Sequence, residues 1–284
     1  MRLVLSRKGF DSSAGGCPNP VFPDGSSVSL PIPDSQSPIG YGDVRHHGGA
    51  MGSLVEDLTG GRVSRHHGAH LDPDLIPAAY PRSDGWRPVL GQHGAAQAHL
   101  LKQGVGEGDL FLFFAVFRQV DRYQGRWRFV PGTRPFHALW GWLQVSEIFP
   151  LQVGHRPPPA WTHYHPHHYG DRGAHNTLYL AGDELTLPGA GLTSTAGAGV
   201  FPCLLPGHRL TGPDSQRLTD WQLPAAFYPC HDRPPLSYHH NPGRWRQGDN
   251  GTCTLRSVAR GQEFVLDMEH YPELVPWLAG LFDG

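Results

Sequence analysis

Residues 109–117 (DLFLFFAVF) constrain the fold more than any other part of this 284-residue chain. After the aspartate the segment is continuously apolar, which is typical of a strand that is buried on both faces. Residues 138–148 (ALWGWLQVSEI) predict a second long strand. We therefore expect two long strands at the centre of a sheet that is covered on both sides.

The composition indicates how the rest of the chain is built. It contains 37 glycines and 28 prolines, and only 17% of its residues are charged, which favours short strands, turns and long irregular loops. Further strands are predicted over 2–5, 176–187, 218–227 and 260–266, and short helices over 52–58, 95–103 and 271–282. The expected fold is a single α+β domain, residues 1–284, mainly β, with a strongly bent sheet or partial barrel, few short helices and long Pro/Gly loops.

Charge and cysteine content exclude several classes of protein. The formal net charge is −2, so bulk electrostatics indicate neither a general nucleic-acid binder nor a membrane binder. The four cysteines form no C-x-x-C pair, which gives no support for a redox motif or a zinc ribbon. No window approaches the roughly 18 apolar residues of a membrane span. The expectation is a cytoplasmic protein with free thiols and no membrane partner.

Histidine is unusually frequent, with 19 residues. Adjacent histidines in a strand point to opposite sides, and the clusters lie among Gly, Pro and Arg, which is typical of solvated loops. We therefore predict no metal site. The clusters are His46-His47, His66-His67-His70, His163-His165-His167-His168 and His239-His240.

The end of the first strand carries a polar cluster of Ser6, Arg7, Lys8 and Asp11. Arginine offers a planar fork to phosphate or carboxylate, lysine adds a point charge, and hydroxyls donate to the same anion. The cluster predicts an anion-binding site, although it lacks the P-loop pattern. The alternative is ordinary surface charge after an edge strand.

A second polar cluster, Gln92, Gln97 and His99, precedes the most apolar strand. Side-chain amides present a donor and an acceptor, so they are suited to the edge of a base or to a donor molecule. His99 or His137 would move a proton, because histidine titrates near neutrality. The alternative role of this cluster is helix capping and packing.

Glu263 lies in the late strand GQEFVLD. A carboxylate buried in an apolar frame has to be paired or hydrogen-bonded. It would act as a general base, or stabilise an oxocarbenium ion in glycosyl chemistry. The alternative is simple strand alternation, with Glu263 facing water.

Residues 118–134 predict an exposed hairpin with five arginines and one aspartate. Aromatic residues are interleaved with the arginines, and this combination suits phosphate contacts and base stacking. The alternative is a solvated hairpin whose aromatics cap the core. The predicted nucleic-acid-binding residues are Arg118, Arg122, Arg126, Trp127 and Arg128.

Five stretches together resemble one known family. They are LSRKGFDSSAGGCPNPVFPDG, GQHGAAQAHLLKQGVGEGDLFLFF, HALWGWLQV, HPHHYGDRGAHNTLYLA and GQEFVLD. The resemblance is to the third family of nucleotide-modification-associated domains, and it covers essentially the whole chain. It implies a nucleic-acid or nucleotide partner and a setting in a DNA-modification or defence system. Asn176, in the fourth stretch, is a further candidate substrate-binding residue. Ala115-Val116 stand where a glycine and an aromatic are expected.

Two more distant resemblances compete for the central strands. GVGEGDLFLFF followed by GWLQVSEI is similar to PUA-like folds, the ASCH and EVE groups, which implies a reader that stacks a modified base on Trp140, Trp142 and Phe114. The chain is also similar to DarT-type DNA ADP-ribosyltransferases. That resemblance implies NAD as cofactor, with Arg7 clamping its phosphates and Glu263 as the catalytic carboxylate.

The leading hypothesis is an enzyme that transfers a group to a nucleotide or nucleic-acid base. Its anion-binding end would be Arg7 and Lys8, and Glu263 would be the essential carboxylate. The alternatives are an NAD-dependent ADP-ribosyltransferase, a reader without catalysis, and a structural subunit with histidine-rich contact loops. NAD is a candidate cofactor only if the protein is an ADP-ribosyltransferase.

Overall fold

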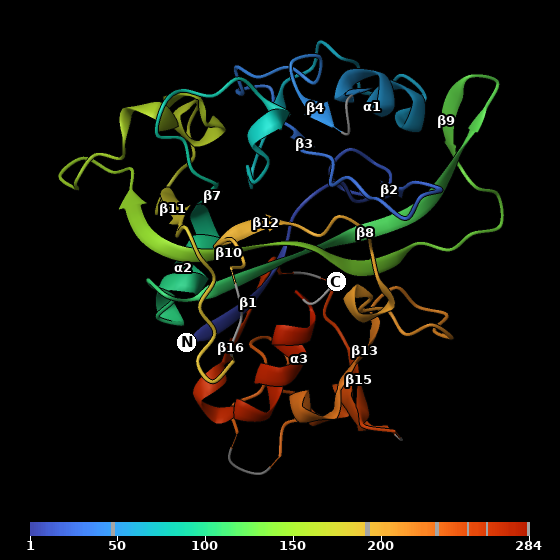
Figure 1. The fold of residues 1–284 in the computed structure, drawn as a ribbon, viewed down its shortest axis with the longest axis vertical. Coiled ribbons are helices and arrows are strands. Elements are labelled where there is room, and N and C mark those ends of the chain that lie inside the picture. Colours follow the sequence, from blue (N-terminus) through green and yellow to red (C-terminus); the bar gives the residue numbers. More distant parts are fainter. Residues whose placement is uncertain (47–48, 191–193, 231–232, 249, 260, 283–284) are drawn as a thin grey trace.

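Two long antiparallel strands, β8 (Leu110–Tyr123) and β10 (Phe136–Pro150), cross the middle of the molecule (Figure 1). Leu110, Leu112 and Phe114 of β8 face one apolar cluster, while Phe111 and Phe113 face another. β8 is therefore buried on both faces, as its composition predicts. The computed structural model describes residues 1–284 except 47–48, 191–193, 231–232, 249, 260 and 283–284.

The other strands of the central sheet are short. Its order is β16-β1-β8-β10-β11-β7, with β1 parallel to β8 and antiparallel to β16. β12 pairs with β10, and β2 and β9 pair with β8. The bounds are β1 Arg2–Arg7, β2 Asn19–Val21, β7 Val89–Gln92, β9 Arg126–Phe129, β11 Thr177–Ala181, β12 Ala198–Val200 and β16 Glu263–Asp267.

The sheet is open but strongly bent. β7 and β16 stand at the two ends of the strand order, yet Gln92 Nε2 of β7 donates a hydrogen bond of 2.5 Å to Glu263 Oε1 of β16. The helix that follows β7, α2 (Gly94–Lys102), places Leu100 in the same apolar cluster as Val4 and Val265. The two edges therefore meet through side chains rather than through backbone pairing.

A layer from the first third of the chain covers one side of the sheet (Figure 1). It has its own apolar cluster, built around Phe10, Tyr41, Leu54 and Val55. Its elements are β3 Ile32–Pro33, β4 Arg45–His46, β5 Gly49–Ala50, α1 Met51–Thr59, β6 Ala69–His70 and η1 Pro77–Ala79. Six prolines between residues 18 and 38 keep the segment before this layer extended.

The C-terminal part covers the opposite side, with a three-stranded sheet in the order β13-β15-β14 (Figure 1). Trp221 and Leu255 of this sheet pack in the cluster that contains Leu3, Leu5 and Phe114. The strands are β13 Asp220–Pro224, β14 Trp245–Gln247 and β15 Thr252–Arg256, and α3 spans Val275–Gly280. Short 3₁₀ helices are η2 Ala160–Tyr164, η3 Pro166–His168, η4 Pro206–His208, η5 Ala225–Phe227, η6 Pro242–Arg244, η7 Met268–His270 and η8 Pro272–Leu274.

The expected fold class, α+β and mainly β with few short helices, is confirmed. The sheet is bent but does not close, so of the two expected forms, a bent sheet or a partial barrel, the structure has the bent open sheet. Sequence reasoning missed β7, β14 and β15, since each has only three to five residues and little apolar content. Arg260, at the start of one predicted strand, and His47 lie outside the described residues. None of the described helices has the length and hydrophobicity that a membrane span requires.

Candidate functional site

The side chain of Glu263 is the centre of a buried polar site. It shares a face of β16 with Val265, so it points into the apolar cluster between β1, β8, β10 and β11, and it is 1% exposed. Ser6 Oγ donates to Glu263 Oε1 at 3.0 Å, and Gln92 Nε2 donates to the same oxygen at 2.5 Å. Glu263 Oε2 is buried and has no hydrogen-bond partner among the described residues.

Burial raises the pKa of Glu263, and the nearby charge of Lys8 only partly opposes this effect. The carboxyl therefore favours its protonated form over a wider range of pH than an exposed glutamate does. Because Oε1 accepts two hydrogen bonds, the proton belongs on Oε2. When Glu263 is protonated, its O–H therefore has no acceptor among the described residues.

A second buried carboxylate, Asp72, pairs with Lys8, whose charge also acts on Glu263. Lys8 Nζ lies 3.3 Å from Asp72 Oδ2 and 3.3 Å from the carbonyl oxygen of Gly91. The other oxygen of Asp72 accepts a hydrogen bond from the Gly91 backbone N–H. Burial alone would raise the pKa of Asp72, but the charge of Lys8 and the contact with His165 hold this pKa well below its usual range. The pKa values of the two buried carboxyl groups are therefore shifted in opposite directions, that of Asp72 downward and that of Glu263 upward.

Three histidines surround Asp72. His165 Nε2 lies 3.4 Å from Oδ1, while His70 Nε2 and His167 Nε2 lie 3.9 and 4.0 Å from Oδ2. The His167 ring packs directly against Gly91, because a Cβ at position 91 would lie 2.3 Å from the ring. A glycine in β7 is thus required for His167 to reach Asp72.

Asn176, predicted to bind substrate, makes two hydrogen bonds with His167. Its Nδ2 donates to the His167 carbonyl oxygen at 2.8 Å, and its Oδ1 lies 2.6 Å from His167 Nδ1. Burial lowers the pKa of His167 well below its usual value, so the imidazole is neutral. Asn176 therefore acts on the site through His167.

Arg7 lies on the opposite side of the sheet from Ser6 and Lys8. Its Nη1 donates to the carbonyl oxygen of Ala259 at 2.9 Å, and its guanidinium lies 5.7 Å from the centre of the Phe114 ring. Successive side chains of a strand point to opposite faces, which explains the separation. Arg7 and Lys8 consequently do not form a common anion site.

His137 lies on the Arg7 side, buried between Phe114 and Trp221. Trp221 Nε1 donates to His137 Nδ1 at 2.9 Å. Burial, together with the charge of Arg7, lowers the pKa of His137 to about 3. His137 is therefore neutral and remote from the Glu263 site.

Gln97 and His99, on α2, make contacts of their own. Gln97 is fully buried and exchanges two hydrogen bonds with the hydroxyl of Tyr179, at 2.7 and 2.9 Å. His99 Nε2 lies 3.0 Å from Ser237 Oγ, and burial lowers its pKa. Asp11 is engaged in its own turn, where its carboxylate accepts hydrogen bonds from the backbone N–H groups of residues 13 and 14. Of the predicted residues, Ser6, Lys8, Gln92 and Glu263 come together.

The arginine hairpin is formed by β8 and β9. Arg128 pairs with Asp121 at 2.9 Å, and Arg118 Nη2 donates to the Val130 carbonyl oxygen at 3.0 Å. Arg122 stacks over Trp127 at 4.7 Å and is exposed, as is Arg126. Two of the five predicted nucleic-acid contacts therefore remain accessible at the hairpin tip, and Trp127 is half-buried between them.

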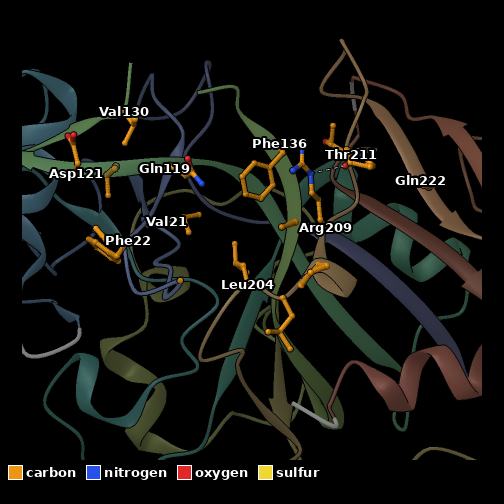
Figure 2. Close-up of a pocket in the computed structure, with 17 residues that line it drawn as sticks. Val21, Phe22, Gln119, Asp121, Val130, Phe136, Leu204, Arg209, Thr211 and Gln222 are labelled. Atoms are coloured by element: carbon orange, nitrogen blue, oxygen red, sulfur yellow. Dashed lines mark hydrogen bonds between the residues drawn. The ribbon is translucent and has the colours of Figure 1, made fainter. Parts of the chain in front are cut away.

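Two cavities lie near these groups. One of about 320 Å³ is lined by Gly9, Asp72, Leu71, Trp140 and Phe201, and so adjoins Lys8 and Asp72. The other, of about 850 Å³, opens between β8, β10 and the loop that carries Leu204 and Arg209. Figure 2 shows Arg209 beside Phe136 in this second cavity. The described lining of neither cavity includes a predicted catalytic residue.

An open, bent sheet with a carboxylic acid, a lysine and a carboxylate buried at one end defines an α+β protein with an internal polar site. The family model for nucleotide modification associated domain 3 matches residues 2–267, and the chain therefore belongs to that family. The resemblance found in the sequence is thus confirmed. Searches of curated proteins and of solved structures gave no significant match.

Sequence reasoning missed Asp72, His70, His165 and His167 as parts of this site. The short pattern His70-Leu71-Asp72 and the segment HPHH were the available signals. Both lie outside the long strands, where no periodicity shows which way a side chain points.

Proposed function

We propose that this protein modifies a nucleotide or a nucleic-acid base, with Glu263 exchanging a proton with the substrate. Membership of a nucleotide modification associated family supports the substrate class. The observation that carries the catalytic role is the arrangement at Glu263, where Oε1 is bound by Ser6 and Gln92 and buried Oε2 has no partner. A buried acid with a free O–H is suited to protonating a ring nitrogen or a leaving group.

The cavity of about 320 Å³ is the proposed binding site of the base. It reaches the polar site through Asp72, because Glu263 is not among its described lining residues. Its volume falls at the lower end of the range for small-molecule sites, about 300–1,000 Å³. Its walls are mainly apolar, with Trp140 on one side and Asp72 as a polar group. Trp140 Nε1 also donates to the Lys8 carbonyl oxygen at 3.2 Å, so the cavity wall is joined to the strand that carries Ser6 and Lys8.

The two alternatives have weaker support. Transfer from NAD needs an arginine on the donor phosphates near Glu263, but Arg7 points to the opposite face of β1. A reader would stack a base between Trp140, Trp142 and Phe114, but Trp140 packs in one cluster while Phe114 and Trp142 pack in the other. We therefore favour group transfer at the Glu263 site from a donor other than one clamped by Arg7.

The test is mass spectrometry of nucleosides from DNA and RNA incubated with the protein, with and without NAD. We expect a new nucleoside mass, formed at least about 100-fold more slowly by Glu263→Gln, which keeps the shape and the hydrogen bonds at Oε1 but has no acidic proton. Glu269→Gln, at an exposed position six residues later, is the matched control and should match the native protein.

Two results would contradict the proposal. A Glu263→Gln variant as active as the native protein would remove Glu263 from the mechanism. Absence of any new mass, with retention of modified oligonucleotides on the protein, would favour the reader.

A further inference from the structure

The cluster around Asp72 has the composition of a metal site. One ligand atom from each of His70, Asp72 and His167 lies within 4.8 Å of the other two. An ion bound at about 2.0–2.1 Å by nitrogen and oxygen holds its ligand atoms about 3–4 Å apart, so small side-chain rotations would bring the three together. All three side chains are nearly buried, with exposed fractions of 10%, 2% and 1%.

The hydrogen bonds behind the two histidines fix which ring nitrogen carries a proton. Asp34 Oδ2 accepts from His70 Nδ1 at 2.8 Å and from Arg172 at 2.7 Å. A carboxylate that is paired with an arginine only accepts hydrogen bonds. His70 Nδ1 must therefore be the donor, and Nε2 is the ring nitrogen that faces Asp72.

The same argument applies to His167. A backbone carbonyl oxygen only accepts, so the bond from Asn176 Nδ2 to the His167 carbonyl oxygen places Asn176 Oδ1 against His167 Nδ1. His167 Nδ1 is then the donor, and Nε2 is again the ring nitrogen that faces Asp72. A ligating histidine typically donates its other N–H to a carboxylate or carbonyl in this way.

The Nε2 atoms of His70 and His167 and the Oδ2 atom of Asp72 thus face one another. No hydrogen bond reaches either Nε2 atom from the described residues, so both nitrogens are available as ligands. His165 differs from the other two, because its Nδ1 accepts from the His167 backbone N–H and its Nε2 therefore carries the proton. His165 is suited to donate to Asp72 and not to bind a metal.

We infer that His70, Asp72 and His167 bind a divalent transition-metal ion through the two Nε2 atoms and Asp72 Oδ2. Two histidines and one carboxylate leave further coordination positions open, a set that suits Fe(II) and also Zn(II). The expectation from the sequence, that the histidines bind no metal, is replaced by this inference for His70 and His167. The inference rests on the geometry alone and not on the proposed function.

Lys8 is the competing cation, since its ammonium lies 3.3 Å from Asp72 Oδ2. Its hydrogen bonds go to Asp72 and to the Gly91 carbonyl oxygen, and neither of them involves the Nε2 atoms of His70 and His167. A bound ion would compete with Lys8 for Asp72 Oδ2. Removing the ammonium in Lys8→Met should therefore leave metal affinity unchanged or increase it.

The experiment uses full-length protein without a histidine tag, stripped with a chelator and titrated calorimetrically with Zn(II), Mn(II) and, anaerobically, Fe(II). We expect one ion per chain, with affinity lowered at least about 100-fold in His167→Ala and about 10- to 100-fold in Asn176→Ala. His163→Ala, an exposed histidine in the same loop, is the matched control and should bind normally. Circular dichroism checks folding, and if His167→Ala does not fold, Asn176→Ala carries the test.

Three outcomes would overturn the inference. The first is no stoichiometric binding of any of the three ions. The second is binding that His167→Ala and Asn176→Ala leave intact, which would assign it to surface histidines. The third is binding by Lys8→Met only, which would make Lys8 the resident cation. Because the readout is bound metal, inactivity on nucleic acids would not affect it.

Discussion

Ser6, Arg7 and Lys8 are consecutive residues that serve two different sides of the sheet. Ser6 and Lys8 reach Glu263 and Asp72, whereas Arg7 packs on Phe114 and lowers the pKa of His137. Each side therefore has its own buried ionisable groups, and their effects on stability have opposite signs. Glu263 favours its protonated form, while His137 favours its neutral form.

His137 should make the protein less stable as the pH falls. Its pKa is about 3 in the folded state, below the value of about 6.5 in the unfolded chain, so the unfolded chain binds the extra proton between these values. The stabilising contribution is complete above pH of about 6.5 and is lost as the pH falls toward 3. We expect His137→Gln to reduce the pH slope of the free energy of unfolding, between about pH 4 and 6, by up to about 1.4 kcal/mol per pH unit.

Urea unfolding at a series of pH values measures this slope. His163→Gln, an exposed histidine, should leave it unchanged. An equal slope in His137→Gln and the native protein would show that His137 is protonated in the folded state.

At the scale of elements, the β8–β9 hairpin combines paired and accessible arginines. Arg128 is tied to Asp121, and Arg118 to Val130 and Thr133, so these two stiffen the hairpin. Arg122 and Arg126 are exposed near its tip. If the hairpin contacts nucleic acid, these two cations are the ones that would meet the phosphates.

The double variant Arg122→Ala/Arg126→Ala should bind duplex DNA more weakly and with less dependence on salt. Loss of two phosphate contacts lowers the slope of log K against log salt by about 2. Fluorescence anisotropy over a range of salt concentrations measures the slope, with Arg246→Ala on β14 as an exposed-arginine control. A slope unchanged in the double variant would exclude the hairpin from the contact.

The sequence predicted the elements that carry a strong pattern. The apolar run of β8 predicted a buried strand. Gly104, which adopts a positive φ of 67°, predicted where α2 ends. Glu263 was predicted because it interrupts a late apolar strand. The alternation of side chains along a strand would also have separated Arg7 from Lys8, but the prediction grouped the two residues because both are positively charged. Asp72 and His167 were beyond prediction, because their loops have no period and tertiary packing sets their direction.

At the scale of the whole molecule, the contact between the two ends of the bent sheet depends on α2. Leu100 of α2 is fully buried in the cluster that contains Val4 and Val265, and its neighbour Leu101 is 53% exposed. We expect Leu100→Ala to lower the free energy of unfolding by about 2–5 kcal/mol, because it leaves a cavity between the sheet edges. Leu101→Ala should change it by less than about 0.5 kcal/mol. Denaturant unfolding of the two variants checks both values, and equal effects would contradict the packing described.

The contact between Ser6 and Glu263 joins residues that are 257 positions apart. During synthesis the N-terminal strand leaves the ribosome long before β16, which must then pair with β1 at the edge of the sheet. Until that pairing occurs, neither Ser6 nor Gln92 has its acidic partner. Chains in which β16 has not yet been made, or from which it has been cut, therefore lack Glu263, so any chemistry at this carboxyl begins only after β16 has paired with β1.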